Sequence, residues 1–234
     1  MLTFLVLMLI VLLFVLIAAL FGKDKGGDIV YVICRTWAAI WYFLIGIRHR
    51  NIYLAPHDKA RQYIFVANHH SYQDIPSLLL TVKQKMRVLG KSELAKVPLF
   101  GFIYSMAAVL VNRQSPEKRA QSVVDMKRVI ASGKSIFIFP EGTFNESDEP
   151  LKSFYDGAFR IAIETQTNIK PILFPDTVNR MHWSSIFKMT PGKNRGIYLE
   201  EINVQEYTSQ DIKLLKEKVY QQMENAIIQL RKND

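Results

Sequence analysis

Two long apolar runs open the chain. Residues 2–21 carry no charged side chain, and residues 29–47 are again apolar, with Arg35 as their one charge. Twenty helical residues span about 30 Å, the thickness of the hydrocarbon core of a bilayer. We therefore expect a transmembrane helix over residues 2–21 and a second segment over 29–47 that either spans the membrane or lies in its interface. A cleaved signal peptide is the weaker reading, because the basic n-region is missing and the run is long.

Polar and basic residues bound these apolar runs. Residues 22–28 form a polar break, and Arg48-His49-Arg50 follows the second run. Basic flanks favour the cytoplasmic side of a membrane. We therefore expect residues 1–50 to anchor the chain to a membrane and residues 51–234 to form one domain on the cytoplasmic face.

From residue 51 onward, short apolar runs alternate with amphipathic stretches. The short runs are rich in β-branched and aromatic residues, as buried strands are. Strands are predicted at residues 63–67, 86–89, 108–112, 135–139, 171–174 and 197–202. Helices are predicted at residues 115–133, 154–165 and 208–230, the last with apolar residues three and four apart. This alternation predicts an α/β sandwich around a mostly parallel sheet.

Charge and composition narrow the choice of partners. The net charge is +9, and 49% of the residues are hydrophobic. No nucleic-acid motif and no dense run of basic residues accompanies this charge, so an anionic membrane surface is favoured over nucleic acid. The single cysteine, Cys34, excludes an intramolecular disulfide. The five histidines show no familiar metal-ligand spacing, so no metal site is expected.

The turn after the strand at 63–67 carries candidate chemistry. His69 and Asp74 are five residues apart, a spacing that would separate them on a continuous helix. They can meet only if His69 lies in the turn and Asp74 in the first turn of the following helix, with Ser71 as its N-cap. The carboxylate would then fix the imidazole tautomer and leave the other nitrogen as a base. The alternative is a capping box from Ser71 to Asp74, with His69 and His70 incidental.

A second turn follows the strand at 135–139. Its residues are Phe139-Pro140-Glu141-Gly142-Thr143. Pro140 ends the strand, and Gly142 allows the backbone to approach a ligand closely. Taken without the first turn, this segment is also compatible with a plain loop.

Together the two turns resemble a known family. Residues 68–74 match the pattern Asn-His-x-Ser-x-x-Asp, and residues 139–143 match Phe-Pro-Glu-Gly-Thr. In this order and spacing they resemble the glycerolipid acyltransferases, typified by 1-acyl-glycerol-3-phosphate acyltransferase, over roughly residues 50–220. The resemblance implies that His69 is a general base and Asp74 its orienting partner. It also implies direct transfer of a fatty acyl group from acyl carrier protein or coenzyme A to a lysophospholipid, with no acyl-enzyme and no bound cofactor.

The resemblance also suggests which residues bind substrate, and it shows departures. The implied substrate-binding residues are Ser71, Lys91, Arg113, Glu141, Gly142 and Thr143. Many members continue the second motif with Arg-Ser and carry Pro-Phe-Lys before Gly-Ala-Phe. Here Phe144-Asn145 and Ser153-Phe154-Tyr155 stand at these places, so two basic positions often linked with the acceptor phosphate are absent. Arg113, Lys91, Lys152 and Arg160 remain as candidates.

These departures leave three functions open. The leading hypothesis is acylation of lysophosphatidate to phosphatidic acid. The first alternative is the same chemistry on another monoacylated lipid, either an N-acyl amino acid or a lysophospholipid with a different head. The second is an inactive, membrane-bound lipid-binding protein that retains the site as a relic.

Overall fold

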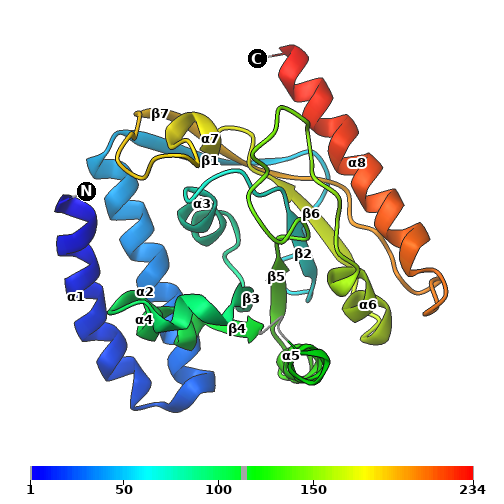
Figure 1. Cartoon of the computed structure of the whole chain (residues 1–234), viewed down its shortest axis with the longest axis horizontal. Coiled ribbons are helices and arrows are strands. Elements are labelled where there is room, and N and C mark those ends of the chain that lie inside the picture. Colours follow the sequence, from blue (N-terminus) through cyan, green and yellow to red (C-terminus); the bar gives the residue numbers. More distant parts are fainter. Residues whose placement is uncertain (1, 112–114, 234) are drawn as a thin grey trace.

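Seven strands form one sheet within the part of the chain that the computed structural model describes, residues 2–111 and 115–233 (Figure 1). Their order is β1-β7-β6-β2-β5-β3-β4. The strands are β1 (Ile47–Tyr53), β2 (Ile64–Ala67), β3 (Met86–Lys91), β4 (Ala108–Val111), β5 (Ser135–Ile138), β6 (Ile169–Leu173) and β7 (Gly192–Tyr198). Neighbouring strands are parallel except for the β6–β7 pair, which is antiparallel. The prediction of an α/β fold around a mostly parallel mixed sheet is confirmed.

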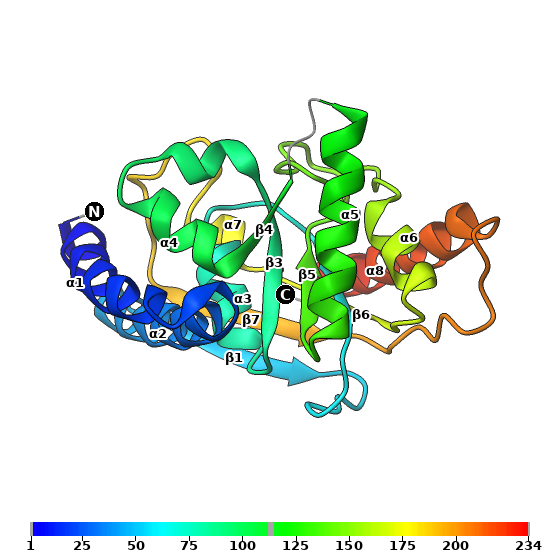
Figure 2. The ribbon, with the colours of Figure 1, turned by 90° about the horizontal axis from the view of Figure 1, so that it is seen from below.

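Helices cover both faces of this sheet (Figure 2). They are α1 (Leu2–Ala19), α2 (Gly22–Leu44), α3 (Asp74–Thr81), α4 (Phe100–Ala107), α5 (Pro116–Ala131), α6 (Gly157–Glu164), α7 (Thr177–Arg180) and α8 (Ile212–Asn233), with a 3-10 turn, η1 (Ser92–Lys96). One layer contains α1 to α4, and the other contains α5, α6 and α8. Alternate side chains of β2 enter the two layers. Phe65 packs with α2 and α3, whereas Ile64 and Val66 belong to the core beneath α6 and α8. Burial on both faces explains the uninterrupted apolar sequence of this strand.

The N-terminal apolar runs fold into a helical hairpin. Within the described residues, no helix combines the length and the apolarity needed to cross a membrane. The transmembrane helix expected over residues 2–21 is therefore not supported. Instead, α1 ends at Ala19, the chain turns at residues 20–21, and α2 runs back beside α1 (Figure 1). Val11, Val15 and Ala18 on one side of α1 are buried against α2 and α4.

Several predicted boundaries change in the structure. The sheet begins at Ile47, because β1 pairs in parallel with β7 along seven residue pairs. The predicted strand over 197–202 is the end of β7 and the segment after it, since the paired residues are Gly192–Tyr198. The predicted helices at 154 and 208 begin later, with α6 at Gly157 and α8 at Ile212.

The carboxyl ends of the parallel strands meet at one edge of the sheet. Asn68, directly after β2, ties this strand to the end of β6. Its Oδ1 accepts the backbone N–H of Phe174 at 2.8 Å, and its Nδ2 donates to the carbonyl of Phe174 at 3.1 Å. The loops that follow β2 and β5 therefore leave the sheet side by side, where parallel α/β sheets usually carry ligand sites.

Candidate active site

His69 and Asp74 are in contact at this edge. His69 lies in the loop after β2, and Asp74 is the first residue of α3. Nδ1 of His69 is 2.7 Å from Oδ2 of Asp74. The carboxylate is fully buried, whereas 17% of the imidazole remains exposed. His69 thus lies in the turn and Asp74 in the first turn of the helix, which is the arrangement that the sequence required for the two side chains to meet.

The Asp74 carboxylate determines which imidazole nitrogen is available. Oδ2 also accepts the backbone N–H groups of His70 at 2.8 Å and Ser71 at 2.9 Å. An ionised carboxylate only accepts hydrogen bonds, so Nδ1 of His69 carries the proton in this contact. In the neutral imidazole, Nε2 then keeps its lone pair and can accept a proton.

Ser71 anchors the loop rather than capping the helix. Its hydroxyl is buried, donates to the carbonyl of Met181 at 2.5 Å and accepts the backbone N–H of Gln73 at 3.1 Å. The N-cap of α3 is Gln73, without a side-chain cap. The expectation that Ser71 is the N-cap is therefore wrong, because its hydroxyl is used within the turn and against the segment after α7.

Glu141 joins the two loops. Its Oε1 accepts the backbone N–H of His69 at 2.8 Å, and its Oε2 accepts the backbone N–H of Lys152, also at 2.8 Å. The loop after β5 also contacts the backbone of His69 directly, because the N–H of Asn145 donates to the carbonyl of His69 at 2.7 Å. Glu141 is only 2% exposed, and this burial raises its pKa to about 7. The two turns singled out in the sequence therefore form one connected structure.

Aromatic rings hold the imidazole of His69. It stacks on Phe139, with ring centroids 3.9 Å apart, and meets the edge of Phe144 at 4.5 Å. Tyr72 packs edge-on against Phe144 at 4.8 Å. Phe144 stands where many family members have an arginine, so this side of the imidazole is apolar here.

The remaining candidate residues differ in their position. Gly142 adopts a positive φ of 72°, a conformation that favours glycine, and closes the turn through its N–H to the carbonyl of Phe139. Thr143 is exposed, with Oγ1 at 3.0 Å from Nζ of Lys152. Lys91 is exposed at the carboxyl end of β3. Arg113 lies outside the described residues.

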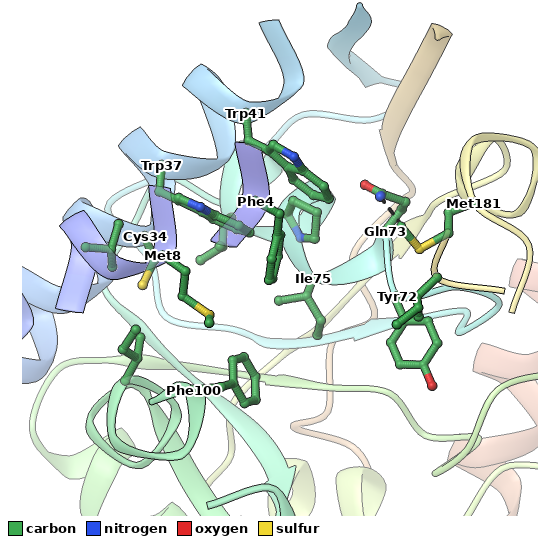
Figure 3. Close-up of a pocket in the computed structure, with 15 residues that line it drawn as sticks. Phe4, Met8, Cys34, Trp37, Trp41, Tyr72, Gln73, Ile75, Phe100 and Met181 are labelled. Atoms are coloured by element: carbon green, nitrogen blue, oxygen red, sulfur yellow. Dashed lines mark hydrogen bonds between the residues drawn. The ribbon is translucent and has the colours of Figure 1, made fainter. Parts of the chain in front are cut away.

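An apolar cavity of about 270 Å³ lies beside the His69 loop (Figure 3). Its walls come from α1, α2, α3, α4 and the segment after α7. Tyr72 and Gln73 line the end next to the catalytic candidates, and Met8 and Cys34 lie at the opposite side (Figure 3). The lining residues that the sequence did not assign to a site include Phe4, Met8, Trp37, Trp41, Phe100 and Met181. The aromatic cluster in the second apolar run is a signal for Trp37 and Trp41, and the sequence offers none for the other four.

Across residues 2–111 and 115–233, no group of three or more His, Cys, Asp or Glu side chains could hold a metal ion.

A paired imidazole and carboxylate beside an apolar cavity, at the carboxyl edge of a parallel sheet, has the position and the groups of an α/β enzyme's active site. The chain belongs to the acyltransferase family, because the family's sequence model, described as Acyltransferase, matches residues 46–174. This assignment confirms the resemblance drawn from the two motifs, and the protein is an acyltransferase enzyme.

Named relatives agree with this assignment. The chain is 25% identical over 212 residues to 1-acyl-sn-glycerol-3-phosphate acyltransferase of Haemophilus influenzae, covering 90% of this chain and 86% of that protein. It is 26% identical over 176 residues to the human 1-acyl-sn-glycerol-3-phosphate acyltransferase beta, covering 74% and 63%. A chloroplastic 1-acyl-sn-glycerol-3-phosphate acyltransferase of Arabidopsis thaliana is 31% identical over 115 residues, which are 49% of this chain and 32% of that longer protein.

A solved structure has the same fold. The crystal structure of the 1-acyl-sn-glycerophosphate (LPA) acyltransferase PlsC from Thermotoga maritima matches with a TM-score of 0.70 and covers 95% of both chains. The sequence identity is 20%, so this likeness concerns the fold.

Proposed function

We propose that this enzyme transfers a fatty acyl group from an acyl carrier protein or coenzyme A thioester to the free hydroxyl of 1-acyl-glycerol-3-phosphate, giving phosphatidic acid. The observation that carries the proposal is the contact between His69 and Asp74, together with the hydrogen bond that joins the backbone of His69 to Glu141. The names of the relatives supply the substrate class.

The proposed mechanism uses Nε2 of His69 as the general base. It takes the proton of the acceptor hydroxyl while the hydroxyl oxygen attacks the thioester carbonyl carbon. The tetrahedral intermediate then expels the thiolate, which recovers the proton from the imidazolium, so ester and thiol are the products. Asp74 stabilises the imidazolium through its 2.7 Å contact with Nδ1. Base assistance of this kind contributes a rate factor of about 10²–10⁴.

The acyl group transfers directly in this proposal, without an acyl-enzyme. Cys34 is the single cysteine of the chain. It lines the apolar cavity at the side away from Tyr72, and burial raises its pKa to about 12 (Figure 3). A thiol with so high a pKa is a poor nucleophile near neutral pH.

The apolar cavity is the proposed site of the transferred acyl chain. Its walls are built almost entirely from apolar and aromatic side chains. One end lies at Tyr72, whose ring contacts Phe144, and Phe144 in turn contacts His69. A chain that enters at this end would keep its thioester carbonyl near the imidazole. Burial of the chain contributes about 0.8 kcal/mol for each methylene.

The enzyme is proposed to lie on a membrane through α1. The side of α1 that faces away from α2 is apolar and exposed: Leu5, Val6, Leu9, Ile10, Leu13, Phe14, Leu16 and Ile17 are each between 44% and 64% exposed. A continuous apolar face of this kind marks a membrane or protein contact. An interfacial helix would bury it at the boundary between headgroups and acyl chains.

This arrangement would bring the lipid substrates to the cavity, because α1 also supplies Phe4 and Met8 to the cavity wall. The exposed Arg48 and Arg50 after α2 suit an anionic, cytoplasmic membrane face. The helical hairpin of α1 and α2 would then serve as an interfacial anchor for the acyltransferase domain.

Phe144 and Tyr155 favour a second candidate acceptor. Both stand where many members have basic residues, so a monoacylated lipid without a phosphomonoester, such as an N-acyl amino acid, is the alternative acceptor. An acceptor panel separates the two, with purified protein, acyl thioester and vesicles, read out as thiol release and as labelled lipid product. Phosphatidic acid formation that disappears in His69→Ala supports the proposal. Inertness toward every acceptor would instead favour a lipid-binding protein without activity.

A further inference from the structure

We propose that Lys152, together with the hydroxyl of Thr143, binds the phosphate of the lysophospholipid acceptor. This inference rests on the proposed function, and it names the cation that replaces the basic residues missing at positions 144 and 155. It concerns a residue outside both sequence motifs.

At positions 144 and 155 this chain lacks the two cations that many family members offer to the acceptor phosphate. The ring of Phe144 packs against His69 at 4.5 Å and can only offer an apolar surface. Tyr155 carries no charge in place of the lysine. A cation at another position of the same loop would replace this lost contact.

Lys152 lies in this loop, and its ammonium faces the turn. Nζ is 3.0 Å from Oγ1 of Thr143 and 3.4 Å from the carbonyl oxygen of Phe144. Both partners are neutral, and an ammonium has three N–H donors. Its charge and a further donor thus remain for an anion. Because Lys152 donates to Oγ1, the hydroxyl hydrogen of Thr143 can also be donated to a ligand.

Three other lysines, by contrast, are paired with acids. Lys127 contacts Glu164 at 2.9 Å, Lys134 contacts Asp24 at 2.6 Å, and Lys216 contacts Asp156 at 2.6 Å. Within residues 2–111 and 115–233, no carboxylate lies within ion-pair distance of the ammonium of Lys152. An exposed lysine held against neutral oxygens is the better candidate for an incoming anion.

Glu141 fixes the backbone of Lys152 relative to the base. One oxygen of this carboxylate accepts the N–H of His69, and the other accepts the N–H of Lys152. In 1-acyl-glycerol-3-phosphate the free hydroxyl and the phosphate are on adjacent carbons. Glu141 holds the backbones of the base His69 and the cation Lys152 close together. This proximity suits an acceptor whose hydroxyl and phosphate are on adjacent carbons.

The test compares Lys152→Gln and Lys152→Arg with the wild type and with Lys127→Gln as a charge-matched control. We expect Lys152→Gln to raise KM for lysophosphatidate about tenfold, the effect of losing one charge-assisted contact. Its KM for the acyl thioester and its thermal midpoint should stay unchanged, because the side chain is exposed. Lys152→Arg should restore most of the affinity, and Lys127→Gln should behave as the wild type.

Direct binding provides the second measurement. In a His69→Ala background, Lys152→Gln should weaken binding of lysophosphatidate about tenfold but leave binding of the phosphate-free monoacylglycerol unchanged. An unchanged KM for lysophosphatidate, or equal losses for both lipids, would overturn the role of Lys152. If the wild type itself fails to acylate lysophosphatidate, the proposed function is wrong, and the inference is wrong with it.

Discussion

The carboxylate of Asp74 lies 2.7 Å from Nδ1 of His69 and uses the same oxygen to accept the backbone N–H groups of His70 and Ser71. One buried oxygen therefore orients the imidazole and shapes the loop that carries it. The contact with Nδ1 sets the tautomer of the imidazole, and the contacts with the N–H groups of His70 and Ser71 fix the loop that carries the ring. Substitutions at Asp74 should affect both properties.

Asp74→Asn should lower kcat by about 10²-fold or more, because an amide cannot stabilise the imidazolium and can present an N–H to Nδ1. Steady-state thiol release measures this effect, and circular dichroism checks that the fold is kept. Asp58→Asn, a substitution in a loop away from the site, is the matched control. Activity within threefold of the wild type would contradict the role of Asp74.

Glu141→Gln should lower kcat and the free energy of unfolding together, with little change in KM for the acceptor. A glutamine has one acceptor oxygen, so its amide N–H₂ would face the N–H of either His69 or Lys152. Loss of one buried hydrogen bond costs about 1–3 kcal/mol. Urea unfolding and initial rates measure the two effects, with the exposed Glu146→Gln as control. A raised KM with unchanged stability would indicate that Glu141 binds the acceptor directly.

His49 should make the fold sensitive to acid. It lies in a polar network between β1, α3 and β7, in contact with Asn51, Thr81 and Asn194. Burial lowers its pKa from 6.5 to about 4. Below pH 6.5 the unfolded chain therefore binds a proton that the folded protein does not, and stability falls as the pH drops toward 4.

His49→Gln should flatten this dependence. The slope of the free energy of unfolding against pH should decrease by up to about 1.4 kcal/mol per pH unit between pH 4 and 6.5, the value for one proton. Urea unfolding at a series of pH values measures it, and His182→Gln, an exposed position, is the control. The same slope in the variant and the wild type would refute the prediction.

Met8→Trp should shift the enzyme toward shorter acyl chains. Met8 lines the cavity from α1, on the side away from Tyr72, and an indole there would occupy space meant for the end of the chain (Figure 3). Each excluded methylene costs about 0.8 kcal/mol, close to a fourfold change in kcat/KM. Competition between thioesters of different length measures the preference. Leu9→Trp, at the neighbouring exposed position, should leave it unchanged, and equal profiles for both variants would argue against this cavity as the acyl site.

Charges on the outer face of α1 should release the enzyme from membranes. The double substitution Leu13→Glu and Phe14→Glu places two carboxylates where the helix would meet lipid, and each lost apolar contact contributes about 1.5–3 kcal/mol. Co-sedimentation with anionic vesicles should fall at least tenfold. Val124→Glu, an exposed apolar position on α5, should not affect it. Retained binding of the double variant would exclude α1 as the membrane contact.

The sequence was informative where local patterns determine structure. The apolar run of residues 63–67 has the length and the β-branched and aromatic content of a buried strand, and the five-residue spacing of His69 and Asp74 allows a single geometry in which they meet. Both features depend on residues close together in the chain. The sheet class and the pairing of these side chains were therefore predictable.

Other features depended on distant partners and were missed. The segment Arg48-His49-Arg50 has the composition of a basic flank, but with Ile47 it begins β1, because its partner β7 lies far along the chain. Trp37 and Trp41 were assigned to a membrane segment, since an apolar aromatic cluster suits an interface as well as a cavity wall. The direction of the Glu141 side chain, toward two backbone N–H groups, could not be derived from its position in a motif.

The pairing of β1 imposes an order of events on the newly made chain. His49 and its hydrogen-bond partner Asn194 on β7 are 145 positions apart. At roughly 5–20 residues per second, many seconds of translation separate these two segments. During that time the N-terminal hairpin has left the ribosome while the edge that receives β1 does not yet exist. The nascent hairpin should thus be a target for chaperones or for early capture by lipid, before the rest of the enzyme is synthesised.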